Sequence, residues 1–239
     1  MRGRPIRLAI ALAAVCGFGV AAAYALGDDV ISSATTCASS TQCSYSSGTF
    51  TITGGQVARF HNATVGGGFY GGTSHNVTAN GSFGGRRLFK SPTISSGSTT
   101  SVNGTQYLAP GDYVFHCTIH GPSMSATLRV VGGAPLARPK VELTVASAKV
   151  AGVRKSGNLA VKVSGSGSKA SGVALSATRS GRTIAHKRGV SVGAGASKAV
   201  KLALSKRGRK SLRGLDRTTI KVAARVPFGR PAAAKRTLH

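Results

Sequence analysis

The sequence predicts an all-β protein built from two domains. Short apolar runs separated by Gly, Ser and Thr recur through residues 26–131, where helical periodicity is weak. Strict alternation of apolar and polar residues begins after the linker at 132–139. Basic residues are also unevenly distributed, because residues 138–239 hold 24 of the 32 Lys and Arg. A change of both pattern and charge along one chain indicates separate domains.

The N-terminal segment has the composition of a secretory signal peptide. Three arginines precede an apolar run from Leu8 to Ala23, and a small-x-small cleavage site ends at Ala25. We therefore expect residues 1–25 to be removed, which leaves a secreted protein with no transmembrane anchor. An uncleaved anchor is the alternative, but the run is shorter than the roughly 20 residues that span a bilayer. A lipoprotein acylated at Cys16 is disfavoured because the apolar run continues past this residue.

The first domain, residues 26–131, combines short β-type runs with glycine-rich turns, which favours a sandwich or a barrel. At Pro110-Gly111-Asp112 the proline presets φ and the glycine tolerates positive φ, so we expect a turn that leads into a strand. The expected strands of this domain are Thr49–Thr53, Gln56–His61, His75–Ala79, Asp112–Cys117 and Ser125–Val131.

The second domain, residues 140–239, follows a linker that Pro135 and Pro139 make stiff and extended. Its period-2 alternation is typical of strands with one face in the core and the other in water. Ser205–Leu215 interrupts this alternation and predicts a short basic helix capped by Ser205. We expect residues 230–239 to be frayed. The expected strands contain the apolar sets Val141–Val145, Leu159–Val163, Val173–Ala177, Val200–Leu204 and Ile220–Val226.

Four side chains of the first domain have the chemistry of metal ligands. Cys117, His120 and Met124 lie close together in the sequence, and His75 precedes them by some forty residues. They supply one thiolate, two imidazoles and one thioether. Soft sulfur with imidazole suits copper, and two His and one Cys with a weak axial Met mark an electron-transfer site. The alternative is a buried free thiol with ordinary polar histidines and a core methionine.

The order and spacing of these residues resemble the plastocyanin, pseudoazurin and amicyanin group of cupredoxins, over about residues 45–131. The matching segments are Ser74-His75-Asn76-Val77, Pro110-Gly111-Asp112-Tyr113-Val114-Phe115-His116-Cys117-Thr118-Ile119-His120, and Met124. The resemblance implies a Greek-key β-sandwich that holds one type 1 copper per chain at one end. It also implies that Asn76 helps fix the thiolate sulfur by hydrogen bonding.

The resemblance implies a function as well: single electrons pass between redox protein partners, and no substrate is converted. His116 occupies the position where copper enzymes of related fold place a ligand to a second metal. Those enzymes need further histidines, and Asn76–Ser82 contains none, so we expect no enzyme activity. Whether His116 binds a second metal stays open. The competing class is a non-redox protein, either a copper store or an adhesive envelope component.

The remaining cysteines are expected to be structural. If Cys16 leaves with the signal peptide and Cys117 binds metal, Cys37 and Cys43 are left as a disulfide pair. Such a bridge persists in the oxidising compartment that an exported protein enters. The alternative is a pair of metal thiolates, although no His or third Cys lies nearby in the sequence.

The second domain loosely resembles small Ig-like β-sandwich modules over about residues 140–227. It carries most of the net charge of +27. An anionic polymer of the cell envelope is therefore a candidate partner, bound by counterion release. Nucleic acid is disfavoured because Phe228 is the only aromatic residue of this domain available for base stacking. A solvated basic face without a ligand is the remaining alternative.

Overall fold

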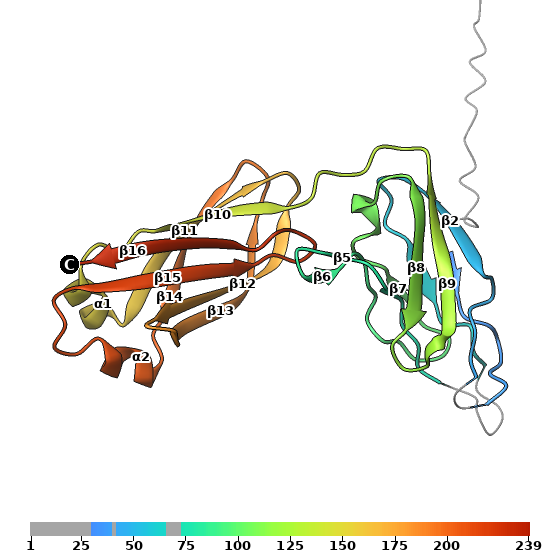
Figure 1. Ribbon diagram of the computed structural model, residues 1–239, viewed down its shortest axis with the longest axis horizontal. Helices are drawn as coiled ribbons and strands as arrows, with labels where there is room; N and C mark the ends of the chain where they lie inside the picture. Colours follow the sequence, from blue (N-terminus) through green and yellow to red (C-terminus); the bar gives the residue numbers. More distant parts are fainter. Residues whose placement is uncertain (1–29, 40–41, 66–72) are drawn as a thin grey trace, which may run out of the picture.

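The computed structural model describes residues 30–39, 42–65 and 73–239 as two β-rich units joined by an extended segment (Figure 1). The predicted signal peptide lies outside the described residues. Within the described part, no helix is both long and apolar enough to cross a membrane. The chain is mostly β-strand and contains several sheets, as the composition and alternation predict.

The first unit is built from two sheets and a small hairpin. One sheet has the order β1-β3-β7, with β1 parallel to β3; the other has the order β2-β9-β8-β4, with β2 parallel to β9. The strands are β1 (Val30–Ser32), β2 (Thr49–Thr53), β3 (Arg59–His61), β4 (Thr78–Ala79), β7 (Thr99–Ser101), β8 (Gly111–Cys117) and β9 (Gly121–Val131). The hairpin joins β5 (Ser82–Phe83) to β6 (Arg86–Arg87), and η1 (Thr105–Tyr107) is a short 3-10 helix.

Alternation along β9 explains how this unit forms its core. Met124, Ala126, Leu128 and Val130 are buried, and the residues between them are exposed or half-buried. This side of the strand packs into a cluster that also contains aromatic rings of Tyr45, Phe50, Phe60, Phe89 and Phe115. Burial of such side chains is the main stabilising term of a β-sandwich.

The second unit has a separate core. Its sheets have the orders β10-β11-β14 and β13-β12-β15-β16. The strands are β10 (Lys140–Val145), β11 (Asn158–Ser166), β12 (Ala170–Arg179), β13 (Arg182–Val192), β14 (Ser197–Ala203), β15 (Thr218–Arg225) and β16 (Ala232–Leu238). The helices are α1 (Val150–Ser156) and α2 (Lys206–Ser211). The core clusters of the two units share no residue, and one ends at Val130 whereas the other begins at Val141.

Most expected elements of the second unit are present, and Ser205 caps α2 by accepting a hydrogen bond from the backbone N–H of Gly208. The expectation that residues 230–239 are frayed is wrong. Ala232–Leu238 form β16, which pairs with β15 along its whole length and buries Leu238 completely. The segment is rich in Ala, Lys and Arg and has little apolar alternation, so its pairing comes from backbone hydrogen bonds at a sheet edge. The strand β13 and the helix α1 were also not expected.

Candidate metal centre

Cys117 and His120 are brought together by a tight hairpin. Cys117 is the last residue of β8, Gly121 is the first residue of β9, and the two residues pair across the sheet. Gly121 has a φ of 62°, a left-handed conformation that glycine adopts at little cost. A three-residue loop closed by a left-handed residue is a common hairpin connection. The thiol and the imidazole therefore lie at the same end of the sheet.

His75 reaches this end from a different segment. It forms an antiparallel bridge with Ile94, in which the backbone N–H groups of the two residues each donate to the other's carbonyl, at 3.0 and 2.9 Å. The chain then continues into β4, which pairs with β8 next to the cysteine. His75 is fully buried, as is Cys117, whereas His120 is half-buried.

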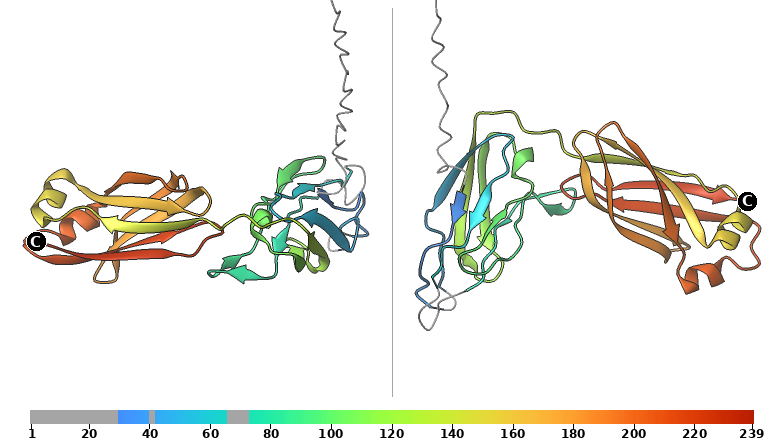
Figure 2. Two further views of the ribbon diagram at one scale, coloured as in Figure 1. Left: turned by 90° about the horizontal axis from the view of Figure 1, so that it is seen from above. Right: turned by 180° about the vertical axis from the view of Figure 1, so that it is seen from behind.

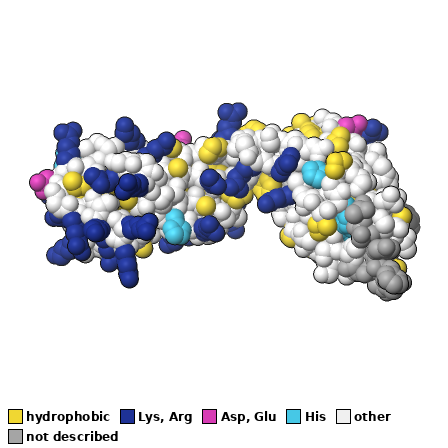
Figure 3. Space-filling view, turned by 60° about the horizontal axis from the view of Figure 1, so that its bottom comes forward, with side chains coloured by type: hydrophobic (Ala, Val, Ile, Leu, Met, Phe, Trp, Pro, Cys, Tyr) yellow, Lys and Arg dark blue, Asp and Glu magenta, His cyan; other side chains and the backbone are white. Residues whose placement is uncertain are grey.

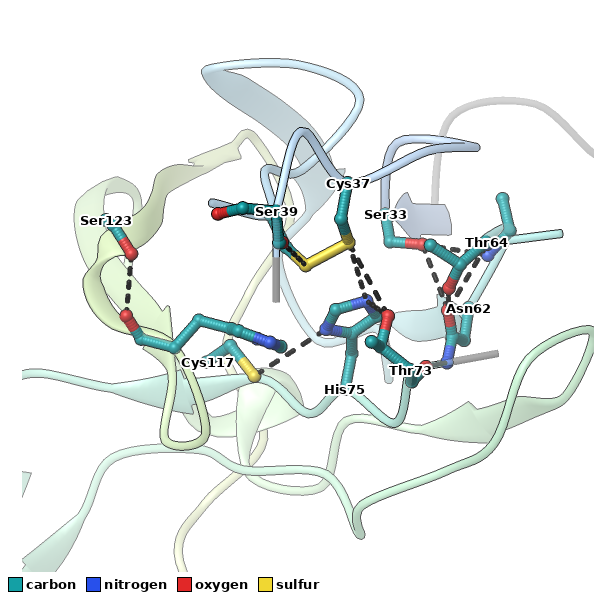
Figure 4. Close-up of a disulfide and its surroundings, with 12 residues drawn as sticks. Ser33, Cys37, Ser39, Asn62, Thr64, Thr73, His75, Cys117 and Ser123 are labelled. Carbon is teal, nitrogen blue, oxygen red and sulfur yellow. Dashed lines mark hydrogen bonds between the residues drawn. A yellow bond between two sulfur atoms is a disulfide. The ribbon is translucent and has the colours of Figure 1, made fainter. Parts of the chain in front are cut away.

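The three ligand atoms of His75, Cys117 and His120 all lie within 4.8 Å of one another. Nδ1 of His75 is 3.9 Å from Sγ of Cys117, and the centroids of the two imidazole rings are 4.8 Å apart. Donors bound about 2.0–2.3 Å from one ion cannot lie more than about 4.4 Å apart, so the His75–Cys117 distance fits joint coordination. Figure 4 shows the His75 ring between the Cys117 thiol and the disulfide.

The outer nitrogen of His75 is held by Thr73. Nε2 lies 3.1 Å from the Thr73 hydroxyl (Figure 4). The backbone carbonyl of Thr73 in turn accepts a hydrogen bond of 2.9 Å from the side chain of the buried Asn62. Asn62 also donates to the carbonyl of Ile94 at 3.1 Å. When Nε2 carries the proton and donates to Thr73, the lone pair of Nδ1 faces the thiol. A partner on the second nitrogen fixes the orientation and tautomer of a ligating histidine in this way.

Burial, and to a smaller extent a positive charge on the neighbouring His120, lower the pKa of His75 to about 4. A buried imidazolium lacks its hydration, so the neutral ring is favoured. His75 is therefore neutral at physiological pH, and this is the protonation state that a metal ligand requires.

The side chain of Asn76 connects the two ligand segments. Its Oδ1 accepts a hydrogen bond from the backbone N–H of Thr118 at 3.0 Å, and its Nδ2 donates to the Thr118 hydroxyl at 2.8 Å. Nδ2 also donates to the Thr93 hydroxyl at 3.0 Å. In the part of the chain that the structure describes, no hydrogen bond of the Asn76 side chain reaches the sulfur of Cys117. Asn76 thus fixes the residue that follows the cysteine.

Met124 is fully buried on β9, in the same hydrophobic cluster as Cys117. It lies on the inward face of the strand, and three residues separate it from the hairpin loop. Its place in the metal site remains a prediction, which rests on the resemblance.

Cys37 and Cys43 form a disulfide, and Sγ of Cys37 lies 4.0 Å from Nε2 of His75. These three residues are close enough to resemble a metal site. Disulfide sulfurs are not thiolates, however, so the two cysteines do not act as metal ligands here. The disulfide instead covers the outer edge of the His75 ring. This result disfavours the alternative of a thiolate metal pair.

His116 lies on the other side of β8 from Cys117. Its Nδ1 is 2.5 Å from Oδ1 of Asn80. In the part of the chain that the structure describes, it belongs to no group of three potential ligands. Position and partner give no indication of a second metal there.

Sequence reasoning missed three residues that shape the site: Asn62, Thr73 and Tyr45. The Tyr45 hydroxyl donates to the backbone carbonyl of Asn76 at 2.7 Å, and its ring centroid is 4.8 Å from that of Phe115. Burial raises the pKa of Tyr45, and a negative charge on Cys117 raises it further. The hydroxyl therefore stays protonated and keeps its role as a donor beneath the site.

Comparison with known proteins gives little further information. No family model and no curated protein matches the chain. A search of solved structures found a chain described as "Biofilm associated protein - BSP domain", with 14% identity and a TM-score of 0.23. The match covers 78% of this chain and 28% of that chain. The present protein thus spans less than a third of it, and a similarity this weak carries no argument about function.

Proposed function

We propose that this protein is an exported type 1 copper protein of the cupredoxin class that carries single electrons between redox partners. The observation that carries this proposal is the convergence of one buried thiol and two imidazoles at the end of a β-sheet. Met124 is assigned as the axial ligand from its position in the chain. The second unit is proposed as an Ig-like sandwich.

The donor set favours copper over other metals. One thiolate with two imidazoles suits copper, and a weak thioether is the usual fourth donor of a blue-copper centre. Zinc also binds Cys and His, so the metal must be identified by experiment. Copper held by these residues would supply a one-electron carrier that alternates between Cu(I) and Cu(II).

The protein's own contribution is to hold the ligands in one arrangement. Thr73 orients the ring of His75, and Asn76 fixes the backbone beside Cys117. Both ligands are fully buried, which keeps water away from them. Ligands that are fixed in this way need little rearrangement when the charge of the site changes.

The half-buried His120 gives the site its accessible side. Its neighbour Ile119 has 52% of its surface exposed, which supplies an apolar contact next to the ligand. A redox partner would approach here. Brief electron-transfer encounters typically use small interfaces of this kind.

The basic second unit would keep the carrier near the cell envelope. Figure 3 shows Lys and Arg side chains gathered over this unit, whereas the first unit has few on the same face. Such a surface attracts anionic polymers by counterion release. The disulfide agrees with a location outside the cytoplasm.

The test is the visible absorption spectrum of the protein loaded with Cu(II), recorded before and after addition of ascorbate. We expect an intense red-region band that reductant bleaches and an oxidant restores. The substitution Cys117→Ser should abolish the band and leave the circular dichroism of the sandwich unchanged. Full copper loading without the band would contradict the proposal and favour a copper store, and a band that persists in Cys117→Ser would disprove the ligand assignment.

A further inference from the structure

A basic cleft lies where the two units meet. The β5–β6 hairpin extends from the first unit toward the second (Figures 1 and 2). Together with the turn between β15 and β16 it lines a cavity of about 1020 Å³. We call this cavity the interdomain cleft. It shares no residue with the candidate metal ligands, and its first lining residue, Asn80, follows His75 by five residues.

The charge of the cleft is one-sided. It is lined by the cations Arg86, Arg87 and Lys90 from the first unit and Arg225 from the second, and all four are exposed. Among the lining residues that the structure describes, none is Asp or Glu. Like charges gathered in one cavity repel each other, and an anion placed between them removes that repulsion.

The few basic residues of the first unit are concentrated at the interdomain cleft. Residues 26–137 hold only five basic residues, although the second unit is strongly basic throughout. Three of those five line the cleft. Repulsion from the basic unit would by itself favour positions far from it for these few cations. Instead, Arg86 and Arg87 form β6 of the hairpin that faces it, and Lys90 follows three residues later.

The walls of the cleft are held by defined contacts between the units. Arg138 donates to the carbonyl of Phe228 at 3.0 Å, and its guanidinium lies 4.4 Å from the centroid of the Phe83 ring. Arg230 lies 5.5 Å from the centroid of the same ring. Phe228 itself has a φ of 57°, an unusual conformation for a residue other than glycine, which persists where the surroundings enforce it.

The hairpin turn adds a second kind of donor. Gly84 and Gly85 line the cleft, and a Cβ added at Gly85 would meet no atom within 4 Å. Because Gly85 lacks a side chain, a ligand can approach its backbone closely. Backbone N–H groups and guanidinium groups together are typical of sites that bind phosphate oxygens.

We propose that the interdomain cleft binds a chain of phosphate groups and that Arg86, Arg87 and Arg225 contact its oxygens. Guanidinium groups bind phosphate through two parallel hydrogen bonds. Several cations in one open cavity match a ligand with several linked charges better than a single ion. The proposal goes beyond electron transfer, because it assigns a ligand to a site that the metal centre does not use.

The test is calorimetric titration of the full chain, in metal-free buffer, with inorganic triphosphate. The double substitution Arg86→Gln and Arg87→Gln should weaken binding by about tenfold or more. The matched control is Arg188→Gln with Arg213→Gln, which removes the same charge from exposed positions of the second unit. The control should change the affinity by less than about twofold. Circular dichroism should show that both variants remain folded.

Two further titrants identify the ligand chemistry. Orthophosphate should bind at least about tenfold more weakly than triphosphate, because it contacts fewer cations. Polyglutamate should show no dependence on Arg86 and Arg87. Equal losses in the two variants, equal affinity for orthophosphate, or the same cleft dependence with polyglutamate would each overturn the proposal.

Discussion

Nδ1 of His75 lies 3.9 Å from Sγ of Cys117, although 42 residues separate them in the chain. This proximity depends on two independent structural features. The pairing of β4 with β8 brings the two segments side by side, and the hydrogen bonds of Asn76 to Thr118 fix their relative position. The candidate metal centre is therefore a property of the sheet rather than of one loop.

Removing the hydroxyl of Thr73 tests whether the orientation of His75 controls metal affinity. In Thr73→Val, Nε2 of His75 loses its partner, and the copper affinity should fall by about 10-fold to 100-fold, as for other histidine ligands that lose such a contact. Competition with a chromophoric chelator measures this change. Thr99→Val is the matched control, because it removes the same group from the exposed Nδ1 of His61. Equal affinities for the two variants would show that Thr73 does not orient the ligand.

Replacing Asn76 separates its structural role from a direct effect on sulfur. Asn76→Ala removes the side-chain contacts with Thr118 and Thr93. We expect the free energy of unfolding of the metal-free protein to fall by about 2 kcal/mol, since each net hydrogen bond contributes about 1 kcal/mol and not all are fully buried. Urea denaturation measures the loss. An unchanged free energy of unfolding, with a shifted copper absorption band, would show instead that Asn76 acts mainly on the sulfur.

The grouping of His75, Cys117 and His120 could be predicted from the sequence, whereas the residues that support this group could not. Cys117 and His120 are separated by only two residues, so a strand end followed by a short loop indicates that they converge. Asn62 and Thr73 lie in a region rich in Ser, Thr and Asn, and nothing local distinguishes the residues whose side chains are buried. Their roles appear only when the pairing of His75 with Ile94 is known.

Strand pairing that the local sequence does not show also explains why β13 and β16 of the second unit were not predicted. Exposed residues run consecutively from His186 to Gly189 within β13, and the pairing of β12 with β13 contains register shifts. A bulge of this kind breaks the alternation that identifies a strand. In β16 only Leu238 is fully buried, so the strand is specified by its partner β15.

The low pKa of His75 predicts that the metal-free protein is less stable in acid. The pKa is about 4 in the folded protein and about 6.5 in the unfolded chain, so the unfolded chain binds more protons between these values. The contribution of His75 is therefore fully present above about pH 6.5 and is lost as the pH falls toward 4, by up to about 3 kcal/mol. Urea denaturation of the metal-free protein between pH 4 and 7 measures it.

The control for this pH dependence is His75→Asn, which removes the titrating group. Its free energy of unfolding should change less over the same range than that of the parent protein. His186→Gln, at an exposed position, should keep the parent profile. If His75→Asn also keeps the parent profile, the acid sensitivity arises from another group.

The disulfide over His75 should stabilise the fold and shield the ligand. Substituting Cys37 and Cys43 together by Ser removes a bridge that closes a short loop, and chain entropy predicts a loss of about 2 kcal/mol in the free energy of unfolding. The sulfur of Cys37 also lies 4.0 Å from Nε2 of His75, so its removal opens the outer edge of the ring to water. We therefore expect copper to be lost faster to a chelator, and stopped-flow absorption measures this rate. Because Cys117→Ser removes a ligand itself, only the double variant tests the covering. An unchanged rate of copper loss, together with the expected loss of stability, would show that the bridge stabilises the chain without protecting the metal site.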